Sequence, residues 1–257
     1  MLIALGWAWL FWWINALSGI GAGNFVGMLL IALGGISPTM AALFLLFRHE
    51  GPAVRRDFFR RIYDLRLIRA PMLAFTLLLP PALLLVAVLL TRLGDDASQP
   101  LAIDPYYVAR PLALLPFALF IMILGPLPEE IGWRGYLLDA LNRKTNALIA
   151  SLLIGLVWGL WHVPLFFIDG YPLAEMTAST PALIIYFGLL LPKSVVYTWL
   201  FFKTNRSIAS AILFHFMINL VGSLVDTSLR CEALQLLLWT IIAGLLIMIS
   251  PAVFRKG

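Results

Sequence analysis

Charged residues are scarce in this sequence, and their scarcity excludes most soluble folds. Only 12% of the 257 residues are Asp, Glu, Lys or Arg, about half the ~25% of soluble domains, and 62% are hydrophobic. The single cysteine, Cys231, excludes an internal disulfide and any metal site built from several cysteines. The apolar runs are about 20 residues long, too long for the ~10-residue strands of a membrane barrel. These absences indicate an all-α integral membrane protein.

Apolar segments follow one another along the whole chain, and no soluble domain, internal repeat or low-complexity tract separates them. We therefore predict a single polytopic membrane domain, residues 1–257, with about eight transmembrane helices. The Gly-Pro-Leu-Pro stretch from Gly125 to Pro128 predicts a break or kink where the fourth helix continues. The predicted spans are 2–20, 25–47, 71–91, 109–127, 146–168, 182–202, 207–228 and 233–254.

Lysine and arginine are distributed unequally between the connecting loops, which predicts the orientation in the membrane. The connection 48–69 carries seven arginines, and the loops on its side of the membrane hold thirteen basic residues in all. The opposite side holds three, Arg92, Arg110 and Arg230. We expect the basic side to be cytoplasmic, with both termini there, as in a protein of the bacterial inner (plasma) membrane. The formal charge of +5 then reflects topology, and we expect no nucleic-acid partner.

The basic connection 48–69 has two interpretations that the sequence leaves open. Phe58, Phe59 and Ile62 are spaced among its arginines, as in an amphipathic helix that lies on anionic membrane lipid. An ordinary loop that obeys the positive-inside rule explains the same composition.

Two adjacent carboxylates and an arginine stand at the end of an uncharged run, in the stretch Leu127 to Gly135. Ionisable groups at that depth are costly, so they normally face a bundle interior or a wet cavity and mark function. In a helix, Glu130 and Arg134 are four residues apart and share a face, so we expect them to pair. Glu129 lies about 100° round the helix and lacks that partner, which makes it a general-base candidate.

Two later segments each carry a histidine. In the fifth, Ser151, Gly155 and Gly159 recur every four residues, a pattern that lets a neighbouring helix approach closely, and His162 follows near that stripe. In the seventh, His215 lies four residues before Asn219 on one face of the helix. A lone histidine in a membrane helix is often a satisfied packing residue. Two histidines, with an asparagine and a free glutamate, weaken that interpretation.

The depths of these polar residues match. At 1.5 Å per residue from the basic side, Glu129, His162, His215 and Asn219 lie about 14 to 27 Å into a hydrocarbon core of about 30 Å. Three helical regions therefore bring a carboxylate, two imidazoles and an amide to the middle of the bilayer. We expect them to line one cavity, open to water on the cytoplasmic side.

These residues resemble the motifs of the CPBP family (CAAX protease and bacteriocin-processing, or Abi) of intramembrane proteases, which includes the type II CAAX prenyl endopeptidases. The family pattern is Glu-Glu-x-x-x-Arg, then Phe-x-x-x-His, then His-x-x-x-Asn or Asp, on three successive helical regions. The resemblance covers about residues 109–225, with tryptophan in place of the usual phenylalanine in the second motif. The matching residues are Glu129, Glu130, Arg134, Trp158, His162, His215 and Asn219.

The resemblance implies an intramembrane endopeptidase with divided roles. Glu129 would act as general base, and His162 would help to hold and polarise the attacking water. His215 and Asn219 would form the oxyanion hole, which stabilises charge on the scissile carbonyl. Glu130 and Arg134 would support the local helix. The tryptophan exchanges one aromatic residue for another, so we expect it to alter pocket shape alone.

A metal is the alternative for the same residues. Glu129, His162 and His215 could ligate zinc with water in the fourth position. The commonest zinc-protease signal, however, has two histidines four apart on one helix, and here each histidine stands alone. Asn219, one turn after His215, is a poor zinc ligand and a good hydrogen-bond donor. We therefore expect no metal or other cofactor, with zinc as the alternative.

The sequence says less about the substrate than about the candidate site residues. We expect a peptide or protein, and a lipidated C-terminus is one option. The alternative class is a non-catalytic immunity protein, scaffold or transporter of the same fold; a transporter would show repeats and paired interrupted helices, which are absent from the sequence.

Lys193, after Pro192 in the sixth span, has three interpretations: a snorkelling residue at a broken helix, a contact to a substrate carboxylate, or a span that starts later.

Overall fold

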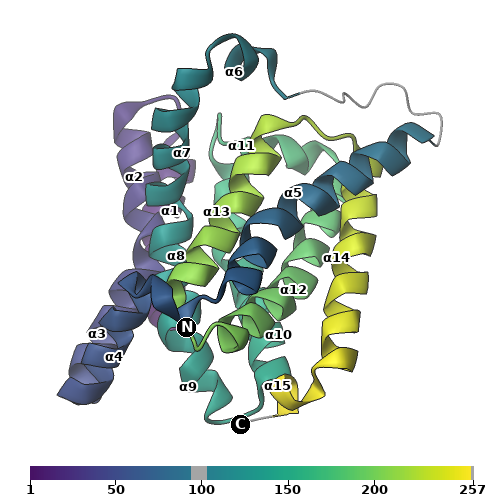
Figure 1. The fold of residues 1–257 in the computed structure, drawn as a ribbon. Helices are drawn as coiled ribbons and strands as arrows, with labels where there is room; N and C mark the ends of the chain where they lie inside the picture. The colour runs from purple at the N-terminus through teal and green to yellow at the C-terminus, as the bar shows by residue number, and fades with distance from the viewer. Residues whose placement is uncertain (94–102, 256–257) are drawn as a thin grey trace.

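A computed structural model describes residues 1–93 and 103–255, and within these ranges the chain forms helices and turns without a strand (Figure 1). A π-helical turn, η3 (Trp133–Leu137), joins α8 to α9, and a 3-10 helix, η4 (Val163–Phe167), continues α10. The α-helices are α1 (Leu2–Ser18), α2 (Phe25–Gly35), α3 (Ser37–His49), α4 (Pro52–Tyr63), α5 (Ala70–Leu93), α6 (Pro105–Ala109), α7 (Leu114–Leu124), α8 (Pro126–Gly132), α9 (Leu138–Asn142), α10 (Ala147–His162), α11 (Pro172–Glu175), α12 (Thr180–Lys203), α13 (Ile208–Leu224), α14 (Leu229–Ile249) and α15 (Pro251–Arg255).

The apolar helices correspond one to one with the predicted spans. Six helical stretches in the described residues are long and apolar enough to cross a membrane, and two shorter apolar helices, α1 and α13, complete the set. The protein is therefore an all-α polytopic membrane protein, as its composition predicts. The six longer stretches are Phe25–His49, Ala70–Leu93, Pro111–Asn142, Ala147–Phe167, Thr180–Lys203 and Leu229–Ile249.

The predicted break in the fourth span is present. α7 ends at Leu124, and Gly125 leaves the helical conformation with φ −119° and ψ −89°. Pro126 has no N–H to continue the hydrogen-bond ladder, so α8 begins there as a separate helix. The backbone N–H of Glu129 then bonds the carbonyl of Gly125 at 3.1 Å, in the first turn of α8. The break therefore sets the position of the Glu-Glu-Arg stretch in the bundle interior.

The small-residue stripe of α10 packs against α12, as predicted. A Cβ atom built on Gly159 would lie 3.0 Å from the ring of Phe187, and one on Gly155 would lie 3.1 Å from the carbonyl oxygen of Leu190. One turn further along, the Ser194 hydroxyl donates to the carbonyl of Ser151 at 2.7 Å. This close approach brings one face of α12 alongside the end of α10 that carries His162.

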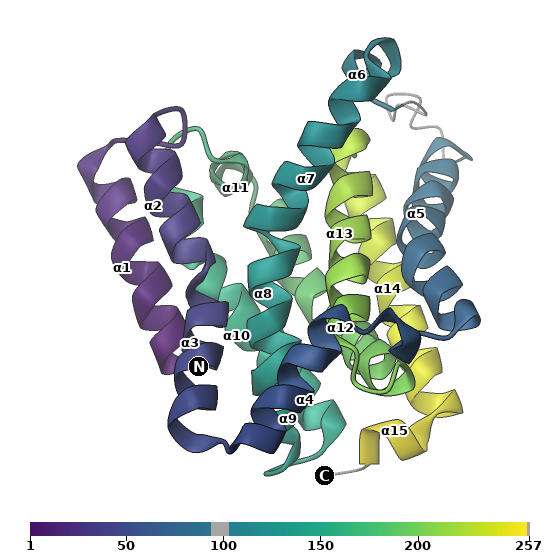
Figure 2. The same ribbon diagram turned by 60° about the vertical axis from the view of Figure 1, so that its left-hand side comes forward.

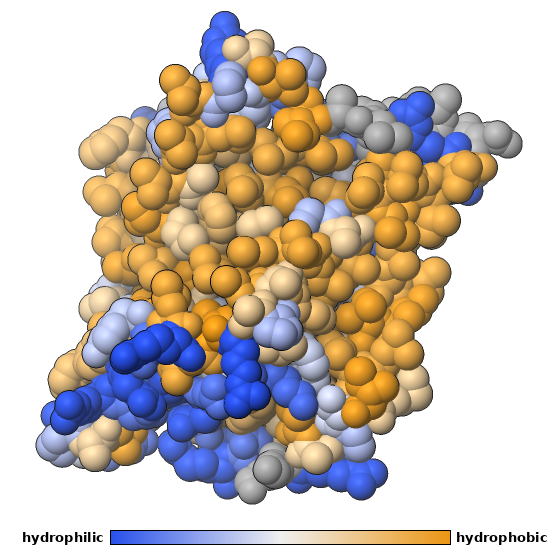
Figure 3. Space-filling view, in the orientation of Figure 1, coloured by the Kyte–Doolittle hydropathy of each residue, from blue (hydrophilic) through white to orange (hydrophobic). Residues whose placement is uncertain are grey.

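The surface has an apolar belt between two hydrophilic ends (Figure 3). α4, α9 and α15 lie at one end, and α6 and α11 lie at the other (Figure 2). The basic connections of the sequence gather at the α4 end, apart from Lys256, which lies outside the described residues. The cytoplasmic location of that end remains a prediction.

The connection 48–69 contains the helix α4, and part of its apolar face is covered by protein. Phe58 is 1% exposed within the core, and a Cβ built on Gly135 would meet its ring at 3.1 Å. Arg61 is also buried and pairs with Asp57 and with Asp139 of α9. α4 therefore packs on the end of the bundle. Of Phe58, Phe59 and Ile62, which suggested an amphipathic helix, Phe59 is the exposed one.

Candidate active site

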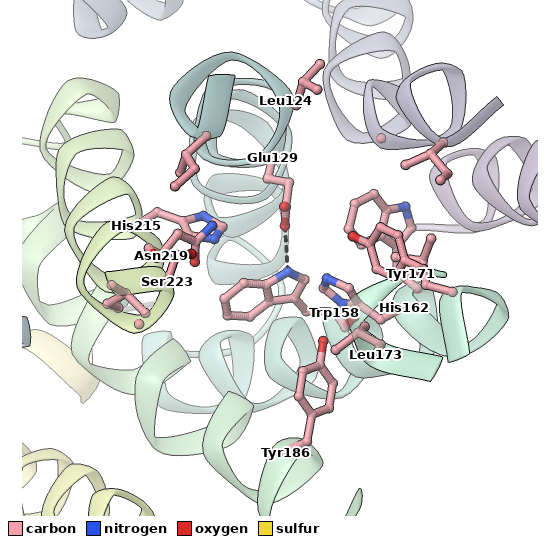
Figure 4. Close-up of a pocket in the computed structure, with 18 of the residues that line it drawn as sticks. Leu124, Glu129, Trp158, His162, Tyr171, Leu173, Tyr186, His215, Asn219 and Ser223 are labelled. Atoms are coloured by element: carbon pink, nitrogen blue, oxygen red, sulfur yellow. Dashed lines mark hydrogen bonds between the residues drawn. The ribbon is translucent and has the colours of Figure 1, made fainter. Parts of the chain in front are cut away.

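A cavity of about 540 Å³ lies in the bundle interior, and the four polar residues predicted to meet all line it. Figure 4 shows Glu129 and Trp158 between two sets of side chains, with His215 and Asn219 on one side and His162 on the other. The carboxylate comes from α8, the aromatic ring and one histidine from α10, and the histidine–asparagine pair from α13. The matched depths in the sequence therefore correspond to a real meeting point.

Glu129 is 6% exposed, and one of its two carboxylate oxygens has a partner that the sequence did not reveal. The indole N–H of Trp158 donates to Glu129 Oε2 at 2.6 Å. Arg134 pairs with Glu130 and not with Glu129, as predicted, but the prediction that the tryptophan alters pocket shape alone is wrong. Phenylalanine has no N–H, so tryptophan at this position supplies a donor that the usual family residue lacks.

Glu130 forms the predicted pair with Arg134. Arg134 Nη1 donates to both carboxylate oxygens, at 2.8 and 3.0 Å, and both residues are 0% exposed. The same carboxylate has a further partner, because His215 Nδ1 lies 2.8 Å from Glu130 Oε1. A carboxylate only accepts hydrogen bonds, so Nδ1 of His215 carries a proton. Nε2 is the ring nitrogen that does not bond Glu130. Glu130 therefore holds a histidine of the site as well as the arginine.

Aromatic rings complete the surroundings of Arg134. Its guanidinium carbon lies 4.0 Å from the ring centroid of Tyr197 and 5.2 Å from that of Trp158. Such cation–π contacts stabilise a desolvated guanidinium. Tyr197 and Trp158 also contact the His215 ring, at centroid distances of 5.8 and 5.3 Å. One packed cluster beneath the cavity thus contains Arg134, Glu130, His215, Tyr197 and Trp158.

His162 is held by its own helix. Its Nδ1 lies 2.8 Å from the carbonyl oxygen of Trp158, four residues earlier. A carbonyl only accepts, so Nδ1 carries the proton and a neutral ring leaves its lone pair on Nε2. The ring also contacts Tyr186 of α12, at a centroid distance of 5.9 Å. His162 can therefore offer an acceptor to a molecule in the cavity.

The second carboxylate oxygen of Glu129 and the amide of Asn219 lie around one point. A Cβ atom built on Gly125 would be 3.4 Å from Asn219 Nδ2 and 3.9 Å from Glu129 Oε1. Glycine at the break between α7 and α8 leaves this space empty. A carboxylate oxygen and an amide donor therefore face the same part of the cavity.

Two tyrosines of the cavity wall were not singled out from the sequence. Tyr186 and Tyr171 lie on the His162 side of the site in Figure 4. Tyrosine is common in apolar spans, and neither residue belongs to a recognisable motif. The spacing of Tyr186, Leu190 and Lys193 on one face of α12 could have indicated that this face lines the cavity.

The cavity does not extend toward the basic end of the molecule. Its lining includes Tyr171, Leu173 and Met176 near α11, and Gly222 and Ser223 near the end of α13. These segments lie opposite α4, α9 and α15 (Figure 2), and the described lining residues include none from the basic connections. A cytoplasmic basic end and a cavity open to the cytoplasm, which we expected together, are therefore not both correct.

The described residues do not form a metal-ligand cluster. No group of three or more His, Cys, Asp or Glu side chains in residues 1–93 and 103–255 is arranged to hold a metal ion. Nδ1 of His162 bonds a backbone carbonyl and Nδ1 of His215 bonds Glu130, an arrangement that leaves Nε2 as the other ring nitrogen in each case and does not decide between water and a metal ion as its partner. Glu129, His162 and His215 are thus not assembled as one ligand set in the described structure, and the expectation of a site without metal stays a prediction.

Comparison with known proteins points to the same region of the chain. Residues 111–221 match the family described as type II CAAX prenyl endopeptidase Rce1-like. Over 233 residues the chain is 29% identical to CAAX prenyl protease 2 of Methanococcus maripaludis, an alignment that covers 88% of this chain and 83% of that protein. The family match nearly coincides with the motif-bearing region, about residues 109–225.

Proposed function

We propose, for this intramembrane protease of the CAAX prenyl endopeptidase type, a glutamate-based mechanism in which water attacks a peptide bond inside the cavity. Both comparisons support the protease, and neither supports the scaffold or transporter alternative. The observation that carries the mechanism is the convergence of Glu129, His162, His215 and Asn219 on one cavity.

Glu129 is the general base of this scheme. Trp158 fixes Oε2, and Oε1 faces the space beside Gly125, where it can accept a proton from water. The water also donates to Nε2 of His162, whose orientation is set by the Nδ1 bond to the backbone. A carboxylate and an imidazole thereby hold one water molecule and align it for attack.

Asn219 and His215 stabilise the tetrahedral intermediate. The hydroxide adds to the scissile carbonyl carbon, and the resulting oxyanion accepts a hydrogen bond from Asn219 Nδ2. Nε2 of His215 donates the second bond when it carries a proton, and Glu130 balances the charge of that imidazolium. The proton on Glu129 then passes to the departing nitrogen, the C–N bond breaks, and a carboxylate and an amine are released. No metal ion enters the scheme.

The substrate is a peptide presented at the membrane, with an apolar or lipidated portion near the scissile bond. The cavity wall between α2 and α7 is apolar, with Ile31, Ala32, Phe120 and Leu124, and two of these side chains, Phe120 and Leu124, are exposed on the bundle surface. An apolar group can therefore enter from the bilayer while the peptide reaches Glu129.

The test is turnover by the purified protein in detergent or liposomes. The probe is a synthetic peptide with an S-farnesyl cysteine three residues before a free C-terminus, and products are identified by mass spectrometry. Glu129→Gln should retain the fold and lower turnover by at least about 100-fold, because the amide cannot accept the proton. Glu175→Gln, which removes an exposed carboxylate of α11 outside the cavity lining, should cleave like the wild type. Normal turnover by a folded Glu129→Gln protein would exclude the mechanism.

A further inference from the structure

One cation on the cavity wall takes no part in the mechanism described above. Lys193 lines the cavity and is the only lysine or arginine among the described lining residues. α12 runs without interruption through Pro192, so the idea of a span that starts later was wrong. Ten residues, a rise of about 15 Å, separate Lys193 from Lys203 at the helix end, farther than a lysine side chain reaches by snorkelling.

The surroundings of Lys193 leave its ammonium without an ion pair. Its Nζ lies 5.8 Å from the ring centroid of Trp239, and no hydrogen bond or ion pair within 4.0 Å joins it to another residue in the described part of the chain. Glu232 of α14 is the acidic residue that interacts with it electrostatically, from a greater distance, and Thr227 donates to that carboxylate. A cation at the middle of a membrane span normally has a partner or faces a functional path.

Lys193 stands on the face of α12 that meets both catalytic histidines. Tyr186, seven residues before it, contacts His162, and Tyr197, four residues after it, contacts His215 at a centroid distance of 5.8 Å. Along the helix axis, Lys193 is therefore about 10 Å from Tyr186 and about 6 Å from Tyr197. Three extended residues span at most about 10 Å. A peptide with its scissile bond among the catalytic groups can therefore bring its third following residue to Lys193.

We propose that Lys193 binds the free C-terminal carboxylate of the substrate and is the residue that makes the enzyme prefer a free acid to an uncharged C-terminus. The inference rests on the proposed function and adds a specificity-determining residue to it. An ammonium and a carboxylate attract strongly in an apolar, water-poor cavity. A lipid phosphate would be a poorer match, because headgroups lie at the edge of a hydrocarbon core about 30 Å thick, whereas Lys193 lies near its middle.

The test compares two forms of one substrate. The farnesylated peptide is prepared as the free acid and as the C-terminal amide, which has the same shape and lacks the charge. Wild-type protein should show kcat/KM about ten- to a hundredfold higher for the acid, the range expected for a hydrogen bond to a charged group. Lys193→Met, which keeps length and apolar stem, should reduce the acid-to-amide ratio to near one, and Lys193→Arg should retain a preference for the acid.

A matched control lies on the same helix. Lys203 also stands over a tryptophan, 6.0 Å from the ring centroid of Trp199, but outside the cavity. Lys203→Met should keep the wild-type ratio. If Lys193→Met does not fold, Lys193→Gln serves as the second neutral variant.

The outcomes separate the two proposals. A Lys193→Met protein that loses activity equally on acid and amide would assign the lysine a structural role against Trp239 and Glu232 and overturn the inference. Wild-type cleavage of both forms without preference would also overturn it, and the proposed function would stand. Wild-type protein that cleaves neither form contradicts the proposed function and removes this inference with it.

Discussion

Arg134 and Arg61 are both almost completely buried arginines paired with carboxylates, but their surroundings differ. Arg134 and its partner Glu130 are each 0% exposed and lie beneath the cavity. Arg61 is 3% exposed, whereas its partners Asp139 and Asp57 are 15% and 34% exposed at the basic end of the bundle.

The two clusters also differ in what they hold. At the basic end, Asp139 accepts from Arg206 as well as Arg61, so the cluster joins α4, α9 and the turn between α12 and α13. Beneath the cavity, Glu130 binds Arg134 and His215, a residue that lines the cavity. Removing one partner of a dry pair leaves an uncompensated buried charge, whereas water screens a half-exposed pair. The same residue types therefore join helices at one end and hold a residue of the candidate site at the other.

The largest effect is expected for Glu130→Gln. The change leaves Arg134 as an unpaired buried cation, which should lower the free energy of unfolding by about 3–5 kcal/mol. The protein that remains folded should turn over at least about 100-fold more slowly, because His215 loses the carboxylate that orients its ring for the proposed oxyanion hole. Thermal unfolding in detergent and turnover per folded molecule measure the two effects.

A double variant sharpens this result. Glu130→Gln with Arg134→Gln removes both charges, so it should recover much of the stability without recovering turnover. Full activity of Glu130→Gln with wild-type stability would contradict the role assigned to the dry cluster.

A smaller effect on turnover is expected for Trp158→Phe, which supplies the usual family residue. The change removes the N–H that donates to Glu129 Oε2, and a hydrogen bond to a charged group corresponds to about a ten- to hundredfold loss. Trp7→Phe is the matched control, since it removes an indole bond to the carbonyl of Leu33 outside the site. Equal turnover of Trp158→Phe and wild type would show that the bond is dispensable for the base.

At the basic end, Asp139→Asn should affect stability alone. We expect the free energy of unfolding to fall by about 1–2 kcal/mol, between the values for exposed and fully buried pairs. Asp57→Asn, at the more exposed partner, should cost less than about 1 kcal/mol. Turnover per folded molecule should match the wild type in both variants. A loss of specific activity in Asp139→Asn would show that the two clusters are coupled.

The smallest effect is expected for metal removal. Thorough chelation should leave turnover unchanged, because the proposed mechanism uses Glu129 as the base and the described residues do not form a metal-ligand cluster. Elemental analysis of the active protein accompanies the assay. Stoichiometric zinc, with activity lost on its removal and restored on its return, would replace the proposed mechanism with the zinc alternative.

Much of this architecture could be predicted because it depends on local sequence. Apolar length predicts the spans, Pro126 and Gly125 predict the break, and the four-residue spacing predicts the Glu130–Arg134 pair. The meeting of the polar residues also followed, since depth in a bilayer can be counted along each helix. The burial of Phe58 could not be predicted, because an amphipathic helix can lie on lipid or on protein with the same pattern.

The sequence by itself determined which residues enter the membrane and which of them are costly there, because both depend on composition and helical period. Only the tertiary structure decided their partners. Trp158 meets Glu129 across 29 residues, and His215 meets Glu130 across 85, between helices whose relative rotation no local pattern specifies. The end of the bundle toward which the cavity extends is also decided by tertiary structure. It depends on how separate helices diverge at one end of the bundle, which is set by packing between them.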